Sequence, residues 1–220
     1  MALAFHGLGT IAQQLRAQQD AMGQTQEVRL GLAVWEADVR AMLPLVDAGA
    51  PSLSRASASE VQFQANVHDL ETVLSAPADA GQTLLAVNDA AGWPEGKEIR
   101  LCSQGACLVN RLLKDGTAAQ LVLAEPLGRA LPVGSTIVVV NDVRYYRMEA
   151  GAGRYKLMRS VDGGAASLMG ELTKVEFQYF TEQRNPTTDA AQIRRVRLTV
   201  EPSSRQTAHR PIMQDVALRS

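Results

Sequence analysis

Apolar residues recur at steps of mostly three, four or seven positions along the first part of the chain, which predicts one amphipathic helix from residue 10 to about 46. The only proline in this stretch is Pro44, near its end. A helix of roughly 35 residues spans about 50 Å, more than the width of a small β-domain. We therefore expect the helix to serve assembly as well as internal packing. The apolar positions are Ile11, Leu15, Met22, Val28, Leu32, Trp35, Val39, Met42 and Val46.

The two halves of this helix differ in character. Residues 13–26 include six glutamines, whereas residues 28–46 carry a stronger apolar stripe. Only the second half is predicted to lie on a sheet. Pro44 and then the segment 47–51, which contains Gly49 and Pro51, are expected to end the helix.

The rest of the chain alternates short strand patterns with turns, which predicts antiparallel β-structure. The expected strands are residues 60–65, 83–87, 98–102, 107–114, 120–124, 136–140, 143–149, 155–161, 172–181, 193–201 and 211–219. The dense run of strands and turns within 82–140 favours a small β-rich barrel or sheet inserted into a larger unit. The expected organisation is a helix (1–47), a first strand with its connection (48–81), the insertion (82–140) and a C-terminal sheet (141–220).

Net charge and composition exclude only a few classes of function. The chain has 220 residues, a formal net charge of −1 and 5% aromatic residues, so it has no overall basic footprint for nucleic acid. No apolar run reaches the roughly 20 residues of a membrane helix. The start, Met1 to Phe5, has no basic region before it and is not a secretory signal. It can be a natural start or the end of a longer apolar segment.

Cys102 and Cys107 flank four residues that fit a hairpin turn. Opposed cysteines beside a tight turn reach disulfide geometry when they form a non-hydrogen-bonded pair. We favour a disulfide, and with it an oxidising compartment, over two buried thiols. Two cysteines with no histidine nearby do not make a zinc site.

The sequence offers no catalytic motif. Gly7, Gly9 and Ala12 fit a dinucleotide fingerprint, but the buried strand and the βαβ unit that this fingerprint needs are missing. The three histidines are scattered, and neither a nucleophile elbow nor a zinc-protease motif is present. Asp89 and Glu95 are better explained by turn chemistry than by loose cation binding. We therefore expect a chain that is not an enzyme and that uses no metal or cofactor.

A basic cluster lies near the C-terminus, and within it Arg195 and Arg197 are expected to share one strand face. Such a face can contact DNA or another anionic surface. A solvated strand face that protects a sheet edge is the favoured alternative. The cluster consists of Arg194, Arg195, Arg197, Arg205 and Arg210.

The order of these features resembles the type IV pilin and type II secretion pseudopilin superfamily, in particular W-type minor pilins and J-type pseudopilins. The helix segment RLGLAVWEADVRAM (29–42) is similar to the family's sheet-facing helix. The strand pair VRYYR (143–147) and YKLMR (155–159), then LTKVEFQY (172–179) and IRRVRL (193–198), resemble consecutive family strands. The ending VALRS (216–220) is similar to a common family C-terminus.

This resemblance implies an α+β fold, with a long N-terminal helix packed on an antiparallel sheet and an inserted β-rich subdomain. It implies a structural subunit that helps to initiate or cap a pilus or secretion pseudopilus, acting with other major and minor pilins or pseudopilins through the helix. The expected packing and assembly face is Leu15, Met22, Val28, Leu32, Trp35 and Val39. The family's leader, cleavage site and apolar anchor are missing, so we expect a chain cut within the helix.

By the same resemblance, the full-length protein would sit in the inner membrane, on its periplasmic side, until assembly carries it to a surface filament. One rival is a binding module, an adhesin or DNA receptor, that uses the 82–140 insertion or the strand bearing Arg195 and Arg197. The other is a secreted enzyme of an unfamiliar type, which a deep polar pocket would support.

Overall fold

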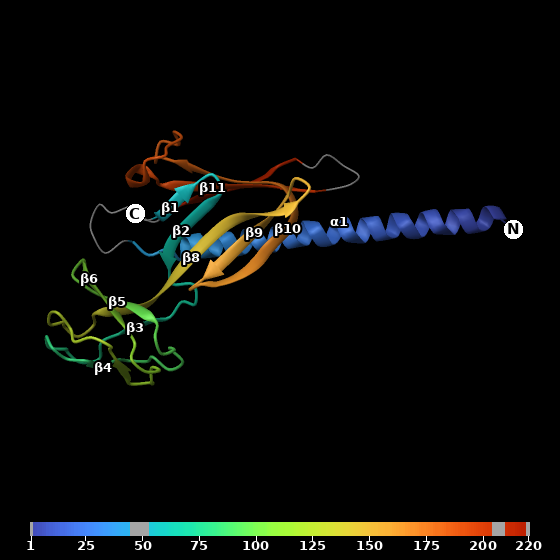
Figure 1. Cartoon of the computed structure of the whole chain (residues 1–220). Coiled ribbons are helices and arrows are strands. Elements are labelled where there is room, and N and C mark those ends of the chain that lie inside the picture. Colours follow the sequence, from blue (N-terminus) through green and yellow to red (C-terminus); the bar gives the residue numbers. More distant parts are fainter. Residues whose placement is uncertain (1, 45–52, 204–209, 219–220) are drawn as a thin grey trace.

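The computed structural model describes residues 2–44, 53–203 and 210–218; the side chains of residues 2–18, 20 and 21 are not described. These residues form one α-helix, twelve strands and a single turn of 3₁₀ helix (Figure 1). The elements are α1 Ala2–Arg40, β1 Leu53–Ser57, β2 Glu60–Ala65, β3 Glu71–Val73, β4 Leu84–Ala86, β5 Glu98–Ser103, β6 Ala106–Arg111, β7 Gln120–Val122, β8 Thr136–Gly151, β9 Arg154–Val161, β10 Gly164–Phe180, η1 Ala190–Gln192, β11 Arg195–Pro202 and β12 Ile212–Ala217.

The main sheet is antiparallel and runs in the order β1-β2-β8-β9-β10-β11-β12. It curls until its first strand approaches β10. There the backbone N–H of Phe177 donates to the carbonyl of Ala58 at 2.9 Å, and the Tyr179 hydroxyl donates to the carbonyl of Ser57 at 2.8 Å. The inward side chains of this sheet and the last third of α1 share one apolar core.

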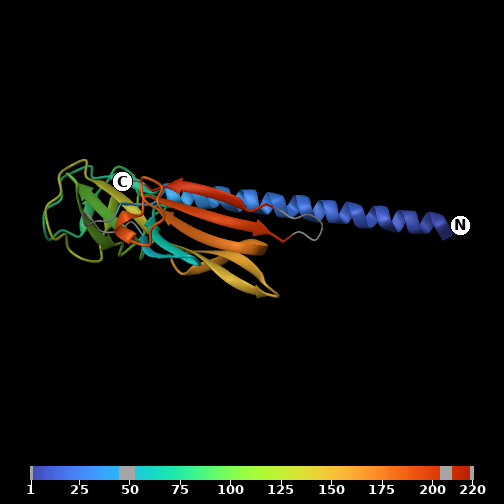
Figure 2. The same cartoon turned by 90° about the horizontal axis from the view of Figure 1, so that it is seen from above.

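The expected α+β class is wrong. The described chain is mostly β, with a single helix and a large curled antiparallel sheet, and it is not a long helix packed on a sheet. Of the helix side chains that the structure describes, only those from Val28 onward enter the core. Figures 1 and 2 show that the N-terminal half of α1 extends far beyond the strands. Because the sheet curls, its strands face one another across the core. Strand residues therefore outnumber helix residues in this core.

The helix begins at Ala2 and ends at Arg40, so both ends differ from the expected 10 to 46. Pro44 has no N–H to continue the helical ladder and disfavours helical backbone at the residue before it. The backbone N–H of Leu43 donates instead to the carbonyl of Gln64 on β2 at 2.9 Å. The segment 45–52, with the expected stop at 47–51, lies outside the described residues.

Strand β8 is one continuous element, although two strands, 136–140 and 143–149, were expected. The expected break fell at Asn141 and Asp142, but Asn141 is fully buried and its side chain is hydrogen-bonded. Its Oδ1 accepts from the backbone N–H of Val67 at 3.3 Å, and its Nδ2 donates to Asp162 at 2.8 Å. Because these polar atoms are satisfied, the strand crosses the junction without interruption.

The first half of β8 belongs to a second, barrel-like unit. It pairs with β3 on one side and β5 on the other, and β5 pairs with β6. A bridge between Leu112 and Leu123 connects the end of β6 to the end of β7, and β7 pairs with β4. A bridge between Leu74 and Val87 then connects the end of β4 to the end of β3. The ring of strands is thus closed, with no long free edge. It includes β3, which precedes the expected insertion boundary at 82.

The barrel has its own apolar core, separate from the core of the main sheet. Leucine dominates this core, and Trp93 is its one aromatic residue, as the low aromatic content of the sequence requires. The buried members are Leu74, Ala78, Leu85, Val87, Ala90, Trp93, Ile99, Leu101, Leu112, Leu121, Leu123, Leu127, Leu131, Ile137 and Val139.

Two glycines in α1 give a test of how the helix meets the sheet. A Cβ at Gly31 would lie 2.6 Å from Cγ and Cε of the buried Met169, whereas a Cβ at Gly23 would meet nothing within 4 Å. We expect Gly31→Ala to lower the free energy of unfolding by about 1–3 kcal/mol through overpacking. Gly23→Ala, the matched control, should raise it by about 0.5–1 kcal/mol through helix propensity. Urea unfolding measures both, and equal stabilisation by the two changes would contradict this packing.

Candidate functional site

The inward face of α1 is fixed by an aromatic cluster. Val28, Leu32 and Val39 are buried with Trp35 in the main core. The Trp35 ring centroid lies 4.8 Å from that of Tyr145, 5.6 Å from Phe177 and 6.4 Å from Phe63. Four residues of the expected assembly face therefore pack inside the chain itself.

A buried ionic cluster anchors the same helix face. Asp38 is 4% exposed. Its carboxylate accepts from the Tyr145 hydroxyl at 2.6 Å and from Nε and Nη2 of Arg159 at 2.7 and 3.0 Å. Burial, then the charge of Asp38, raises the pKa of Tyr145, and the hydrogen bond to Asp38 raises the pKa of Arg159. Both donors thus keep their protons at neutral pH, and the helix is held in one register.

The apolar periodicity did not identify this cluster. Asp38 lies three residues after Trp35 and next to Val39, on the face predicted to be buried. A carboxylate on a buried face needs a cationic or hydroxyl partner. The sequence therefore contained a signal for a partner, but not the identity of Tyr145 and Arg159, which come from β8 and β9.

Hydrogen bonds flank the helix on both sides. The Glu27 carboxylate accepts from the backbone N–H of Gly170 at 2.7 Å, and Nε2 of Gln24 donates to the carbonyl of Glu171 at 2.9 Å. On the other side, Nε2 of Gln214 on β12 donates to Glu36 at 2.9 Å. The Gln24 and Glu27 contacts extend the attachment of the helix about one turn before Val28, its first core residue.

The opposite, solvent-facing side of α1 is also apolar. Met22, Leu30 and Val34 are 70%, 64% and 36% exposed. With the exposed Gln26, Ala33 and Ala37 they follow helical spacing along the outer surface. Among the described side chains, this outer stripe (Met22, Gln26, Leu30, Ala33, Val34 and Ala37) contains no charged residue. Met22 of the expected assembly face lies here, and the Leu15 side chain lies outside the described ones.

The two candidate DNA-binding arginines lie side by side on the outer face of β11, but both are paired. Arg195 and Arg197 share the carboxylate of Asp215 on β12, at 3.5 and 3.0 Å. The Arg197 guanidinium also lies 4.6 Å from the ring centroid of Phe180. This arrangement fits a solvated strand face better than a free basic patch, and a DNA contact stays a prediction. The expected protection of a sheet edge does not apply, because β11 is paired on both sides. Arg205 of the same cluster lies outside the described residues.

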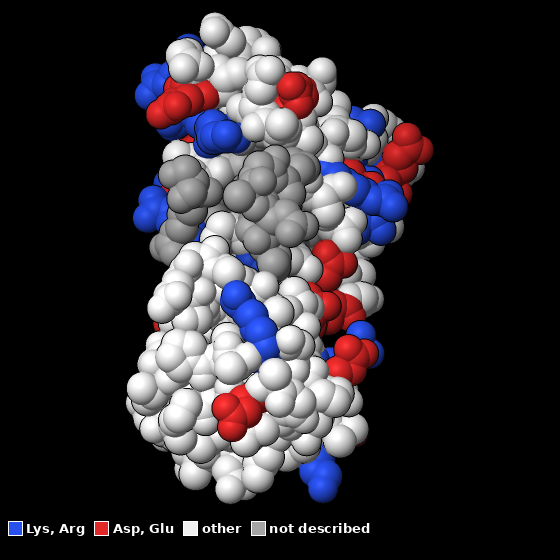
Figure 3. All heavy atoms as spheres, turned by 90° about the vertical axis from the view of Figure 1, so that its left-hand side faces the viewer, with Lys and Arg blue, Asp and Glu red and all other residues white. Residues whose placement is uncertain are grey.

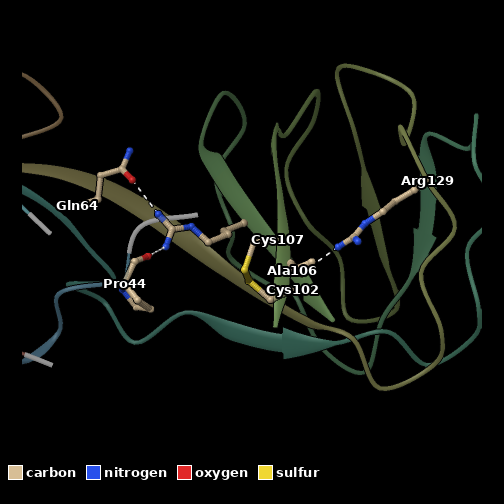
Figure 4. Close-up of a disulfide and its surroundings, with 7 residues drawn as sticks. Pro44, Gln64, Cys102, Ala106, Cys107 and Arg129 are labelled. Atoms are coloured by element: carbon tan, nitrogen blue, oxygen red, sulfur yellow. Dashed lines mark hydrogen bonds between the residues drawn. A yellow bond between two sulfur atoms is a disulfide. The ribbon is translucent and has the colours of Figure 1, made fainter. Parts of the chain in front are cut away.

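Cys102 and Cys107 form a disulfide that closes the β5–β6 hairpin (Figure 4). They are directly opposed in the ladder, with Cα atoms 4.1 Å apart. Gln104 and Gly105 make the turn with φ of 53° and 80°, the left-handed conformations of a two-residue hairpin. The disulfide favoured from the sequence is thus present.

Arg100, two residues before the disulfide, ties the barrel to the chain that leaves the helix. It is 2% exposed and donates to the carbonyl of Pro44 and to Oε1 of Gln64, the latter at 2.8 Å (Figure 4). Burial lowers the pKa of Arg100. Its guanidinium remains the charged group at the junction because the ordinary pKa of arginine is far above neutral.

A polar cleft of about 320 Å³ lies where the barrel meets the main sheet. Lys97 from the barrel and Asp162 from the β9–β10 turn form an ion pair across it. The side chains around the cleft are mostly polar and carry both signs of charge. It is lined by Gln64, Glu95, Gly96, Lys97, Glu98, Arg111, Val140, Asp142 and Asp162.

The part of the chain that the structure describes holds no group of three or more His, Cys, Asp or Glu arranged to bind a metal ion. In the same residues, we find no helix with the length and apolarity needed to cross a membrane. Comparison with known proteins adds no relative: no family model matches the chain, and no curated protein matches it. The function must therefore be argued from the surfaces described above.

The ionic cluster predicts a large effect of losing Asp38. Asp38→Ala leaves the Arg159 guanidinium and the Tyr145 hydroxyl without their acceptor, and should lower the free energy of unfolding by about 3–5 kcal/mol. Tyr145→Phe removes one hydrogen bond and should cost about 1–3 kcal/mol. Urea unfolding of both variants tests this. An Asp38→Ala protein as stable as the parent would show that the cluster does not anchor the helix.

The ion pair across the cleft predicts a pH dependence. Burial alone would raise the pKa of Asp162, but hydrogen bonds from Lys97, Asn141 and the backbone of Asp142, with the charge of Lys97, lower it below its ordinary 3.8. A lowered pKa in the folded state means stability that is present above about pH 4 and is lost as pH falls through the folded pKa.

Asp162→Asn should therefore reduce stability at pH 7 and make little difference at pH 3. Urea unfolding at pH 7, 5 and 3 measures the difference, with Glu149→Gln on the exposed β8–β9 hairpin as control. A destabilisation by Asp162→Asn that is equal at pH 7 and pH 3 would contradict the assignment.

Proposed function

We propose that this chain is a non-catalytic subunit of a pilin- or pseudopilin-type filament, of the minor kind that helps to start or cap assembly. The observation that carries the proposal is the outer stripe of α1. A helix whose opposite side is buried in its own core gains nothing from a second uncharged apolar side unless another surface covers it.

A second helix is the partner that this stripe fits best. The segment from Met22 to Ala37 contains 16 residues and covers about 23 Å of helix, and its apolar positions repeat at helical spacing. The small side chains of Ala33 and Ala37 allow a neighbouring helix to approach closely, with Leu30 and Val34 as the larger contacts. Arg29 and Glu27 border the stripe on its two sides, which suits helices packed in a bundle.

The placement of α1 and the strand sequences support the same proposal. The N-terminal half of the helix extends away from every strand (Figures 1 and 2), where helices of neighbouring subunits can reach it. The strand motifs that resemble minor pilins lie on β8, β9, β10 and β11, which are consecutive neighbours in the main sheet. The disulfide accords with the periplasmic and surface location that such a subunit would have.

The proposal can be tested by introducing glutamates into the outer stripe of the native protein, expressed in its own bacterium. Leu30→Glu with Val34→Glu should reduce incorporation into sheared surface filaments, or secretion through the pseudopilus, at least tenfold. Val133→Glu, a similar change at an exposed barrel loop, should leave incorporation unchanged. Urea unfolding of the purified chains should show both variants folded, since all three side chains are exposed.

Unreduced incorporation of the double variant would overturn the proposal. Mass spectrometry of the mature N-terminus in the same cells gives an independent readout. A processed, N-methylated first residue ahead of an apolar segment is expected for this class. A mature chain that starts at Met1 would reject the class.

A further inference from the structure

The charged side chains of the barrel are concentrated in one segment. Residues 95–115 contain seven of them, whereas residues 74–94 and 116–140 contain two each. Figure 3 shows the barrel, the lower lobe of the view, as a mostly uncharged surface. Four of the seven line the cleft of about 320 Å³ between the barrel and the main sheet: Glu95, Lys97, Glu98 and Arg111. The cleft is therefore the place where this unit collects its charge.

Three of the lining residues form one row across neighbouring strands. Arg111 of β6 is directly opposed to Glu98 of β5, and Glu98 is directly opposed to Val140 of β8. Directly opposed residues point to the same face of a sheet. Arg111 is exposed, Glu98 is half-buried and Val140 is buried. The row therefore offers a cation, an anion and an apolar side chain, in that order, from solvent into the cleft.

The two charges of this row do not pair with each other. None of the ion pairs within the described residues contains Glu98 or Arg111, although opposed charges in a ladder attract. Instead, Oε1 of Glu98 accepts from Nε2 of Gln64 on β2 at 3.2 Å. Oε1 of Gln64 in turn accepts from Nη2 of the buried Arg100 at 2.8 Å (Figure 4). Arg100 thus fixes Gln64, and Gln64 holds Glu98 on the β2 side, away from Arg111.

The other charges near the row have different partners or positions. Lys97 forms an ion pair with Asp162, and both carboxylate oxygens of Asp142 accept from a neighbouring glutamine side chain. Residues 114–115, a lysine and an aspartate, do not line the cleft. Glu95, which is exposed, adds one carboxylate to the lining. The opposed arginine and glutamate of the row are therefore the groups of opposite sign that a ligand can bridge.

We propose that this cleft binds a free α-amino acid with an apolar side chain. Such a molecule carries a carboxylate and an ammonium group on one carbon, so it fits between two opposite charges that are close but held apart. Its carboxylate binds the planar donor fork of Arg111, and its ammonium group binds the carboxylate of Glu98. Its side chain then lies toward Val140. Junctions between structural units are common places for small-molecule sites, and this site does not rest on the proposed filament role.

Titration of the whole chain with L-norleucine, followed through amide chemical shifts by NMR, tests the proposal. Saturable shifts are expected at Glu98, Arg111 and Val140, with a dissociation constant of roughly 1 mM or lower. n-Pentylamine, which lacks the carboxylate, and hexanoate, which lacks the ammonium group, should each bind at least tenfold more weakly. Glycine, which keeps both charges but lacks the apolar side chain, should bind several-fold more weakly.

Glu98→Gln and Arg111→Gln should each weaken norleucine binding at least tenfold. Glu149→Gln and Arg184→Gln, matched changes at exposed positions outside the cleft, should leave it unchanged. The absence of a saturable shift with norleucine overturns the proposal. So does pentylamine that binds as tightly as norleucine, which would show a surface that only attracts cations, or norleucine binding that neither cleft variant weakens. If a variant fails to fold, the comparison of ligands on the unchanged chain still decides the question.

Discussion

Strand β8 runs unbroken through sixteen residues, and both halves of the protein are built on it. Its first half closes the barrel between β3 and β5, and its second half pairs with β2 and β9 in the main sheet. Because a single strand is stiff over this length, the barrel cannot turn freely relative to the sheet. Two barrel residues reinforce this link. Arg100 donates a hydrogen bond to the carbonyl of Pro44, and Lys97 forms an ion pair with Asp162. The same strand supplies Tyr145 to the helix anchor, so the position of α1 is also set from β8.

The helix anchor shows how a small part of α1 controls the placement of all of it. The apolar residues around Trp35 provide burial, but apolar contacts alone tolerate sliding and rotation. The bidentate pair between Asp38 and Arg159 has one geometry, so it selects a single register. Its net contribution to stability is small relative to a packed apolar replacement, because burying the two charges costs desolvation. Its benefit is therefore specificity: the outer stripe always faces away from the sheet.

Local patterns in the sequence predicted local structure well. Alternation located most strands, the spacing of Val28, Leu32, Trp35 and Val39 predicted a buried helix face, and the turn between Cys102 and Cys107 predicted their opposition. The fold class was not predictable from such patterns. Periodicity and length predicted a long helix of which only the second half lies on the sheet, but not that the sheet would curl and supply most of the core itself. Closure of the barrel depends on bridges between distant residues such as Leu74 and Val87, which no local pattern encodes.

The polar junction was missed for a related reason. Asn141 and Asp142 have low strand propensity, and only their tertiary hydrogen bonds make a continuous strand favourable there. Asp38 could have been suspected as a charge on a predicted apolar face, but its partners lie more than 100 residues away in the chain. Buried polar residues are thus the positions where this sequence says least about its structure. They are also the positions that orient the helix and the barrel.

Charge on the main sheet is arranged to cancel locally. Arg195 and Arg197 share Asp215, Arg144 pairs with Glu60, and Lys174 pairs with Glu176. With a net charge of −1, the molecule has little long-range field to attract or orient a charged partner. Without such a field, the surfaces best able to hold a partner are those that gain free energy from leaving water. Among the described residues, the outer stripe of α1 is such a surface. The proposed contact through this stripe would thus be selected by shape and burial, with little electrostatic steering.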